Sequence, residues 1–285
     1  MVSLTIRKLS LTLAGAVFMA FAMVWAVTGG GHDAHAQSLN IASGGENGGP
    51  VEIFADDGIE WQQEQNIFIA RGNAKAVRGE VEVVSDVLKA YYRETAGNTE
   101  IWRLDAEGSV EIRSPSETAF GDLAIYDVIN GVLVIRGEDV RFVAGADTIT
   151  ARDQIEYWEV KQIAVARGDA VAVRGDKTLK AEVLVAHFNR DAGGSTDIHR
   201  VDAYDHVTIV SAQETATADR GVYQVGTGIA TLTGAVKITR GQNVLTGCRA
   251  QVNLNTGISK FFACEEPSGQ RVQGVLLPES NSAGQ

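Results

Sequence analysis

Two adjacent carboxylates, Asp56 and Asp57, are the first side chains in the sequence that could perform acid–base chemistry. Paired carboxyl groups hydrolyse glycosidic bonds when they face each other across a cleft. Neighbouring side chains of a strand point to opposite faces, so this pair is badly placed for that reaction. We interpret the pair as a turn at the end of a strand.

Histidine and serine offer no better candidate. Beyond residue 36 the histidines are His187, His199 and His206. His199 and His206 could meet around a strand, but no third or fourth ligand stands at the spacing of a metal site, so solvated surface side chains are favoured. Ser109 lacks the context of a nucleophile elbow, and the sequence contains no P-loop. We predict no catalytic residue, no metal and no cofactor, and therefore a protein that is not an enzyme.

The two cysteines, Cys248 and Cys264, lie symmetrically about Thr256 in the segment Asn255-Thr256-Gly257. A three-residue hairpin loop with Gly257 in the left-handed conformation would place them directly opposite each other. We predict a disulfide, which would contribute about 3 kcal/mol in the chain-entropy model. A reactive thiol or a metal role is the alternative, and no C-x-x-C spacing or histidine companion supports it.

Aromatic and basic side chains recur along the chain. The aromatic residues could form a platform for carbohydrate, although core or rim packing is favoured: Trp61, Trp102, Trp158, Tyr91, Tyr126 and Tyr157. The arginines could meet phosphates, although outward, solvated charge is the plainer interpretation: Arg71, Arg78, Arg136, Arg167 and Arg174.

The N-terminal 36 residues predict a secretory signal peptide, and hence a periplasmic location. Arg7 and Lys8 precede an uncharged, mostly apolar run from Leu9 to Val27, and Ala34-His35-Ala36 provides a cleavage site. The run is close to the lower limit for a membrane span, so an uncleaved anchor in the inner membrane is the alternative. Residues 37–50 are rich in Gly, Ser and Asn and predict a flexible leader, and residues 265–285 predict a flexible tail.

The charge of the chain excludes one class of partner. The formal net charge is −11, and removing Arg7, Lys8 and Asp33 with the signal peptide makes it −12. Because the phosphate backbone rewards positive charge, we predict no nucleic-acid binding. Any lipid binding should come from apolar surface.

Residues 51–264 contain a repeat, which is the informative feature of the sequence. Its centres are Gly72, Gly108, Gly137, Gly168, Asp205 and Gly234. An acidic residue opens another strand about fourteen residues past most centres (Asp86, Asp122, Glu182 and Asp219), and Cys248 takes this place in the last unit. Positions −4, −2, +2 and +4 are apolar in all six units, if the third is shifted by one residue after Glu138. They are Phe68, Ala70, Ala74, Ala76, Leu104, Ala106, Val110, Ile112, Leu133, Ile135, Val140, Phe142, Ala164, Ala166, Ala170, Ala172, Val201, Ala203, Val207, Ile209, Ala230, Leu232, Val236 and Ile238.

This alternation predicts six strands with one buried face and one wet face. The fold class is therefore all-β, an elongated twisted β-jellyroll or sandwich of repeated antiparallel strands. The central glycine would let the strand bend without a side chain crowding the interior. The many inward alanines either leave volume for an apolar slot or let two faces approach closely in a core.

The repeat resembles the OstA-like family of lipopolysaccharide transport, which includes the periplasmic bridge protein LptA and the N-terminal domain of its outer-membrane partner. The strands that carry the resemblance are Gly72 to Gly79 (GNAKAVRG) and Gly168 to Gly175 (GDAVAVRG). The family's A-D-x-A-x-Y strand is matched by Ser85 to Tyr92, Gly121 to Tyr126 and Ala218 to Tyr223. The segment from Val51 to Ile59 resembles the family's first strand. The centre at Asp205 departs from glycine, so the resemblance covers both the bridge protein and close relatives.

The resemblance implies an apolar interior that holds the acyl chains of lipopolysaccharide. The expected lipid-contacting residues are Phe68, Ala70, Ala74, Ala76, Leu104, Val110, Ile112, Leu133, Ile135, Phe142, Ala170, Ala172, Val207, Ile209, Val236 and Ile238. It also implies strands at open ends that pair with an LptC-like inner-membrane component, an LptD-like outer-membrane translocon or another copy, with edge residues Val51, Ile53, Ala55, Ile258 and Phe261. A scaffolding envelope protein and an enzyme acting on polysaccharide are the alternatives.

Overall fold

The computed structural model describes residues 51–95, 98–115, 117–190, 196–212, 214–253, 255–256, 258–264 and 271–276. The predicted signal peptide and leader, residues 1–50, lie outside the described residues. None of the helices in the described ranges is long and apolar enough to cross a membrane.

The prediction of an all-β fold is confirmed. One 3-10 turn, Val225–Thr227, accompanies eighteen strands in the described residues. The strands are β1 Glu52–Phe54, β2 Gly58–Gln62, β3 Ile67–Arg78, β4 Val81–Thr95, β5 Asn98–Arg113, β6 Glu117–Asp127, β7 Val132–Arg136, β8 Val140–Ala144, β9 Asp147–Ala151, β10 Gln154–Trp158, β11 Ile163–Arg174, β12 Lys177–Arg190, β13 Thr196–Val210, β14 Thr215–Gln224, β15 Ile229–Arg240, β16 Asn243–Asn253, β17 Ile258–Phe262 and β18 Gln273–Val275.

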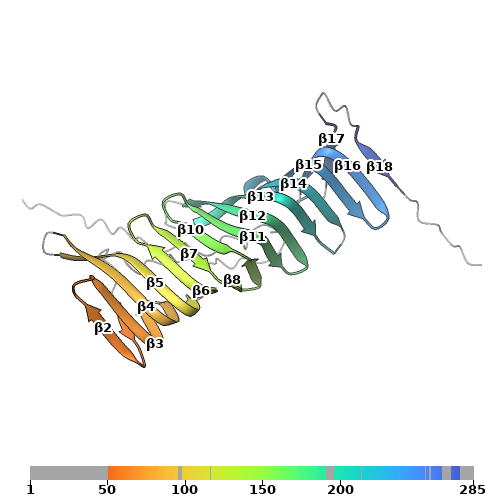
Figure 1. The fold of residues 1–285 in the computed structure, drawn as a ribbon. Helices are drawn as coiled ribbons and strands as arrows, with labels where there is room; N and C mark the ends of the chain where they lie inside the picture. Colours follow the sequence, from red (N-terminus) through yellow and green to blue (C-terminus); the bar gives the residue numbers. More distant parts are fainter. Residues whose placement is uncertain are drawn as a thin grey trace, which may run out of the picture.

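The strands form one antiparallel stack in which most strands pair with their neighbours in sequence. Figure 1 shows the stack as an elongated body, with the strands running across its long axis, β2 and β3 at one end and β17 and β18 at the other. Most contacts therefore join hairpin neighbours, as a repeated sequence with short turns predicts.

Each repeat centre lies at a break in the pairing register. On β3 the register shifts between Arg71 and Ala74, and on β11 it shifts between Arg167 and Ala170. Gly72 and Asn73, in the first break, both have positive φ, at 77° and 42°. Such bulges bend a strand and increase its local twist. We call this row of breaks the corner of the stack.

The corner divides the sheet into two parts. Half-sheet A contains β2, β7, β10, β17 and the parts of the long strands that pair with them, such as residues 67–71 of β3 and 163–167 of β11. Half-sheet B contains β1, β8, β9, β18 and the parts beyond the corner, such as residues 75–77 of β3 and 171–174 of β11. A single long strand thus contributes to both.

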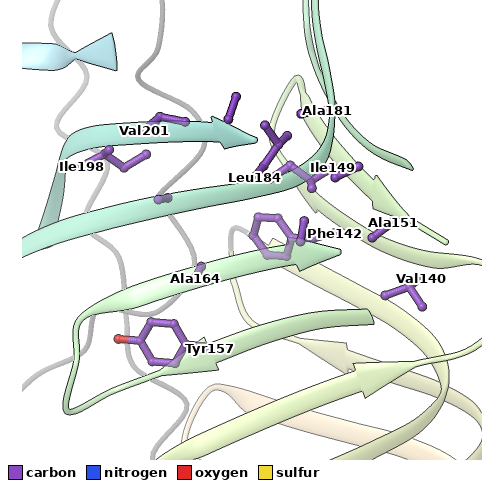
Figure 2. Packing of buried hydrophobic residues seen from close by; sticks show 14 of the residues in the cluster. Val140, Phe142, Ile149, Ala151, Tyr157, Ala164, Ala181, Leu184, Ile198 and Val201 are labelled. Carbon is purple, nitrogen blue, oxygen red and sulfur yellow. The ribbon is translucent and has the colours of Figure 1, made fainter. Parts of the chain in front are cut away.

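The interior lies between the two half-sheets. Of the 24 positions predicted to point inward, 19 are buried, five are half-buried and none is exposed. Figure 2 shows part of this cluster, with Phe142 and Ile149 from half-sheet B and Ala164 and Val201 from half-sheet A. The predicted alternation of faces is confirmed.

The reason for the central glycine was predicted wrongly. A Cβ at Gly72, Gly108 or Gly168 would not enter the interior but would collide with a carboxylate of a neighbouring strand, Asp57, Asp86 or Asp153. These carboxylates lie on the exposed side of the corner. Glycine is required there because the bulge needs positive φ and because an aspartate occupies the space.

The C-terminal tail also differs from the prediction. Residues 273–275 of the segment predicted to be flexible form β18, which pairs with Val244 to Thr246 of β16. A strand of three residues is too short to show a period of two in the sequence.

Candidate functional site

The interior between the half-sheets is the candidate site, because it is apolar and continuous along the stack. One row of half-sheet A runs through Ala70, Leu88, Ala106, Ala124 and Ile135, each paired with the next across a strand boundary. The matching row of half-sheet B runs through Ala76, Val83, Ile112, Ala119 and Phe142. Cross-strand neighbours of this kind place their side chains on one face.

This interior is packed and does not form the open slot that the alanines suggested. Side chains of both half-sheets belong to one cluster, in which Ala166, Ala170 and Leu184 are fully buried. A cavity between β12, β13, β14 and β15 has a volume of about 30 Å³, enough for one or two atoms the size of a methylene group. The structure agrees with the other interpretation of the alanines, in which small side chains let the two half-sheets pack closely against each other.

Aromatic side chains close the interior along the margin of half-sheet A, away from the corner. They are Phe68, Tyr92, Tyr126, Tyr157, Phe188 and Tyr223, and all are buried or half-buried. Phe68 packs on Tyr92 at 5.1 Å between ring centroids, and Tyr157 meets Phe188 edge-on at 6.1 Å. Burial raises the pKa of the Tyr126 hydroxyl, which donates a hydrogen bond to Glu159 (2.9 Å). This margin is apolar with a polar outer edge.

Half-sheet B has a charged margin instead. Glu117 on β6 and Asp147 on β9 stand at alternate positions of their strands whose side chains point inward. Only 4% and 7% of their surfaces are exposed. Glu117 Oε1 and Asp147 Oδ1 are buried without a hydrogen-bond partner. Burial raises the pKa of Glu117 to about 7, and it raises the pKa of Asp147 against the opposing effect of Arg174, whose Nε lies 3.4 Å away.

The sequence analysis missed these buried acids. Glu117 is two residues before Ala119, and Asp147 is two residues before Ile149. Because every second side chain of a strand lies on the same face, both acids could have been placed on the inward face. Arg174 also follows inward parity, at the end of β11, so the prediction of purely outward charge was wrong for it.

The outer face of half-sheet A carries three further buried carboxylates, each paired with an arginine. Asp105 accepts from Arg103 (2.6 Å), Glu156 from Arg167 (2.6 Å), and Asp202 from Arg200 (2.6 Å). The first and third ion pairs lie within β5 and β13, and the second joins β11 to β10. Each of the three carboxylates is therefore held by a guanidinium group and is not poised for acid–base work.

The histidines are arranged differently from the prediction. His187 and His199 meet at 6.1 Å between ring centroids, whereas His206 lies at the corner. His187 Nε2 is 2.9 Å from Asp202 Oδ2, so His187 is not simply a solvated side chain. Within the described ranges no group of three or more His, Cys, Asp or Glu side chains could hold a metal ion.

The paired carboxylates Asp56 and Asp57 lie in a turn, as predicted. Asp56 accepts a hydrogen bond from the Asn73 amide (2.7 Å), and the main-chain N–H of Asp57 donates to Arg71 O (3.0 Å). The tryptophans and tyrosines considered as a sugar platform are split between faces. Tyr91 and Trp102 pack together at 5.6 Å, while Tyr126 and Tyr157 are interior.

Both ends of the stack present strand edges. β1 and β2 pair with β3, and β17 and β18 pair with β16. Within the described part of the chain, no second partner covers these four strands. The prediction named one edge strand at each end, and the structure has two, because each half-sheet ends in its own short strand. Val51 and Ala55 flank β1, Ile53 is within it, and Ile258 and Phe261 are in β17.

The predicted disulfide joins Cys248 and Cys264, with their Cα atoms 4.9 Å apart. The hairpin register differs from the prediction, because Asn253 pairs with Ile258 and Arg249 with Phe262. The cysteines are therefore one position out of direct opposition, and the bond forms just beyond the end of β17. Gly257 lies outside the described residues.

Comparison with known proteins identifies the family of the chain. The family model described as LptA/(LptD N-terminal domain) LPS transport protein matches twice, over residues 52–162 and 148–258. An uncharacterized protein of Rhizobium meliloti (strain 1021) is 29% identical over 133 residues, which is 45% of this chain and 69% of that protein. LptH of Pseudomonas aeruginosa, titled the LptA homologous periplasmic component of the lipopolysaccharide transport device, aligns with 80% of this chain and 96% of its own at 10% identity, with a TM-score of 0.21.

The strand pairing and the buried cluster define an edge-open β-stack with an apolar interior. The two family matches cover most of the described residues, and the chain belongs to the LptA/LptD N-terminal domain family of lipopolysaccharide transport proteins.

Proposed function

We propose that this chain carries lipopolysaccharide across the periplasm, with the lipid acyl chains held between half-sheets A and B. The observation that carries the proposal is the apolar interior, which extends from β3 to β16. Membership of a lipopolysaccharide transport family supports it. The sixteen interior residues expected to touch lipid, from Phe68 to Ile238, are the contact residues in this proposal.

The physical need for such an interior follows from the hydrophobic effect. Exposing an acyl chain of about a dozen carbons to water costs roughly 10 kcal/mol. In the packed structure an acyl chain has to replace contacts between the half-sheets. That exchange trades one apolar contact for another and exposes no interior side chain to water, so its cost is mainly disturbed packing. Burial of the lipid offsets it.

The two margins suit an amphipathic cargo. Half-sheet A closes the interior with aromatic rings, whereas half-sheet B presents Glu117, Asp147 and Arg174. Acyl chains would lie inside, and the polar head group would lie along the charged margin.

The open ends supply the means of connection. Unpaired strand edges are normally a liability, and a partner strand can complete them. In this proposal β1 and β2 meet one neighbour and β17 and β18 meet another. The neighbours are an LptC-like inner-membrane component, an LptD-like translocon, or another copy of the chain in head-to-tail contact.

Site-specific photocrosslinking in cells that make lipopolysaccharide tests the proposal. A photoreactive residue at Phe68, Phe142 or Ile209 should give adducts with lipopolysaccharide. Lys75 and Glu111 are matched controls, because both pair with Val84 in one row on the outer face of half-sheet B. Adducts from interior and outer positions alike would overturn the interior site. Adducts from neither set would favour a scaffolding role.

A further inference from the structure

The cavity between the half-sheets occupies one particular repeat unit. Leu179 and Ile209 line it from half-sheet B, and Val201, Ala203 and Leu232 line it from half-sheet A. Val207 lies beside it, directly after the corner. The cavity is therefore a gap in the apolar packing between the half-sheets.

A glycine, Gly221, is among the residues that line this cavity. The second residue after each corner acid points inward, and the row reads Leu88, Ala124, Ile155, Leu184, Gly221 and Ala250. A Cβ at Gly221 would stand 3.3 Å from Leu232 Cδ2, 3.5 Å from Val207 Cγ1 and 3.7 Å from Ala203 Cβ. All three residues line the cavity.

The corner beside the cavity also differs from its neighbours. At the flanking corners Asp153 lies against Gly168, and Asp219 lies against Gly234. At the corner of this unit Asp205 replaces the glycine, with a φ of 61°, and His206 follows it at 54°, as Asp169 and Ala235 follow the glycines of the flanking corners at 45° and 42°. Glu182, which stands in the place of the aspartate, forms an ion pair with Arg152 (3.4 Å).

Asp205 thus holds a backbone conformation that glycine adopts freely, and Glu182, the acid of this corner, is paired with Arg152. Asp tolerates the left-handed region, but at a conformational cost that glycine does not carry. This corner, which joins the two half-sheets along β13, lies directly beside the cavity.

We infer that the cavity beneath Gly221 binds the end of a saturated acyl chain and is the point at which the half-sheets first separate. The inference rests on the proposed lipid-carrying function and adds the place where lipid enters. A preformed apolar gap receives the first methylene groups without displacing packed side chains. Further insertion then parts the interface from this unit outward, in both directions along the stack.

Filling the cavity tests the inference on the purified chain. The Gly221→Val variant places a side chain among Leu232, Val207 and Ala203, whereas a Cβ at Gly226 meets nothing within 4 Å. Gly226→Val is therefore the matched control, and neither glycine has positive φ. With fluorescent lipopolysaccharide as the probe, Gly221→Val should bind about tenfold more weakly than the wild type, and Gly226→Val should bind equally well.

A second measurement does not depend on a variant that folds. The probe is dodecanoic acid with a diazirine at its terminal carbon, added to the wild-type chain at less than one molar equivalent. The mixture is irradiated, and mass spectrometry then locates the adducts on the chain. Adducts concentrated in peptides of β12 to β15 support the inference. Adducts spread evenly over the six units, or concentrated near Phe142 and Ile112, overturn it.

The two failures are distinguishable. A wild-type chain that binds no lipopolysaccharide overturns the proposed function and this inference with it. A wild-type chain that binds, together with a folded Gly221→Val variant of equal affinity, overturns the entry site alone.

Discussion

The carboxylate of Asp122 accepts a hydrogen bond from the main-chain N–H of Glu138 (2.8 Å), in the space that a side chain at Gly137 would need. In four further pairs an aspartate likewise occupies the space that a side chain at the glycine would need: Asp57 and Gly72, Asp86 and Gly108, Asp153 and Gly168, and Asp219 and Gly234. The pairs stand at the corner, where each long strand passes from one half-sheet to the other. They fix the bend that makes an enclosed interior possible.

Two glycines of β11 and its turn separate the cost of backbone conformation from the cost of collision. Gly168 (φ 82°) would place a Cβ 2.5 Å from the Asp153 carboxyl carbon, whereas Gly175 (φ 56°) faces open space. Both alanine variants lose about 1 kcal/mol from the positive φ. We expect Gly168→Ala to lose a further 1–2 kcal/mol or so, because Asp153 must move. Equal losses in thermal unfolding would show that the carboxylate is not tightly seated.

Glu117 should make stability depend on pH. Its pKa is about 7 in the folded protein and 4.5 is the ordinary value, so the folded state binds more protons between these pH values. Stability is therefore fully present below pH ~4.5 and falls as pH rises through about 7, by up to about 3 kcal/mol. Glu117→Gln should abolish this decline in denaturant unfolding measured from pH 5 to 8. A decline that persists in the variant would assign it to another group.

Arg167 supports a buried carboxylate on the outer face. Burial acts to raise the pKa of Glu156, but hydrogen bonds from Arg167, Trp158 and Gln154 outweigh it and lower that pKa. Arg167→Met removes the charged partner of a side chain that is only 6% exposed. Because Arg167 itself is half exposed, we expect a loss of about 1–2 kcal/mol. Adding Glu156→Gln should recover part of that loss, and a double-mutant cycle without coupling would refute the pairing.

The disulfide should stabilise the C-terminal end of the stack. Cys248 stands where earlier units have the corner acid, and Cys264 follows it by 16 residues. Closing so short a loop contributes about 3 kcal/mol in the chain-entropy model. A reductant should therefore lower the melting temperature of the wild type and leave a Cys248→Ser/Cys264→Ser variant unchanged. An identical response of both proteins would mean that the bond is not formed in solution.

The sequence was sufficient to predict which face of a strand each side chain occupies, because side chains along a strand alternate between its two faces. Phe142 and Val236 could be placed inside on that basis alone. The partner of each corner glycine could not be predicted, since Asp86 and Gly108 meet only after the register of β4 on β5 is set. The same limit explains the cysteine hairpin, whose register differs by one position from the symmetric arrangement.

How closely the two half-sheets pack could also not be predicted from the sequence. Alanines such as Ala166 and Ala170 permit either a gap or tight contact, and the choice depends on side chains contributed by the facing half-sheet. Gly221 could have been noticed as the one missing side chain in its row. Its effect required knowing that Leu232, Val207 and Ala203 surround it.

The repeated bend has a consequence for how this architecture changes size. Each unit adds two strands, and therefore about 10 Å of length, whereas the angle at the bend sets the cross-section. Gain or loss of a whole unit would thus alter the length of the stack and leave the width of its interior unchanged.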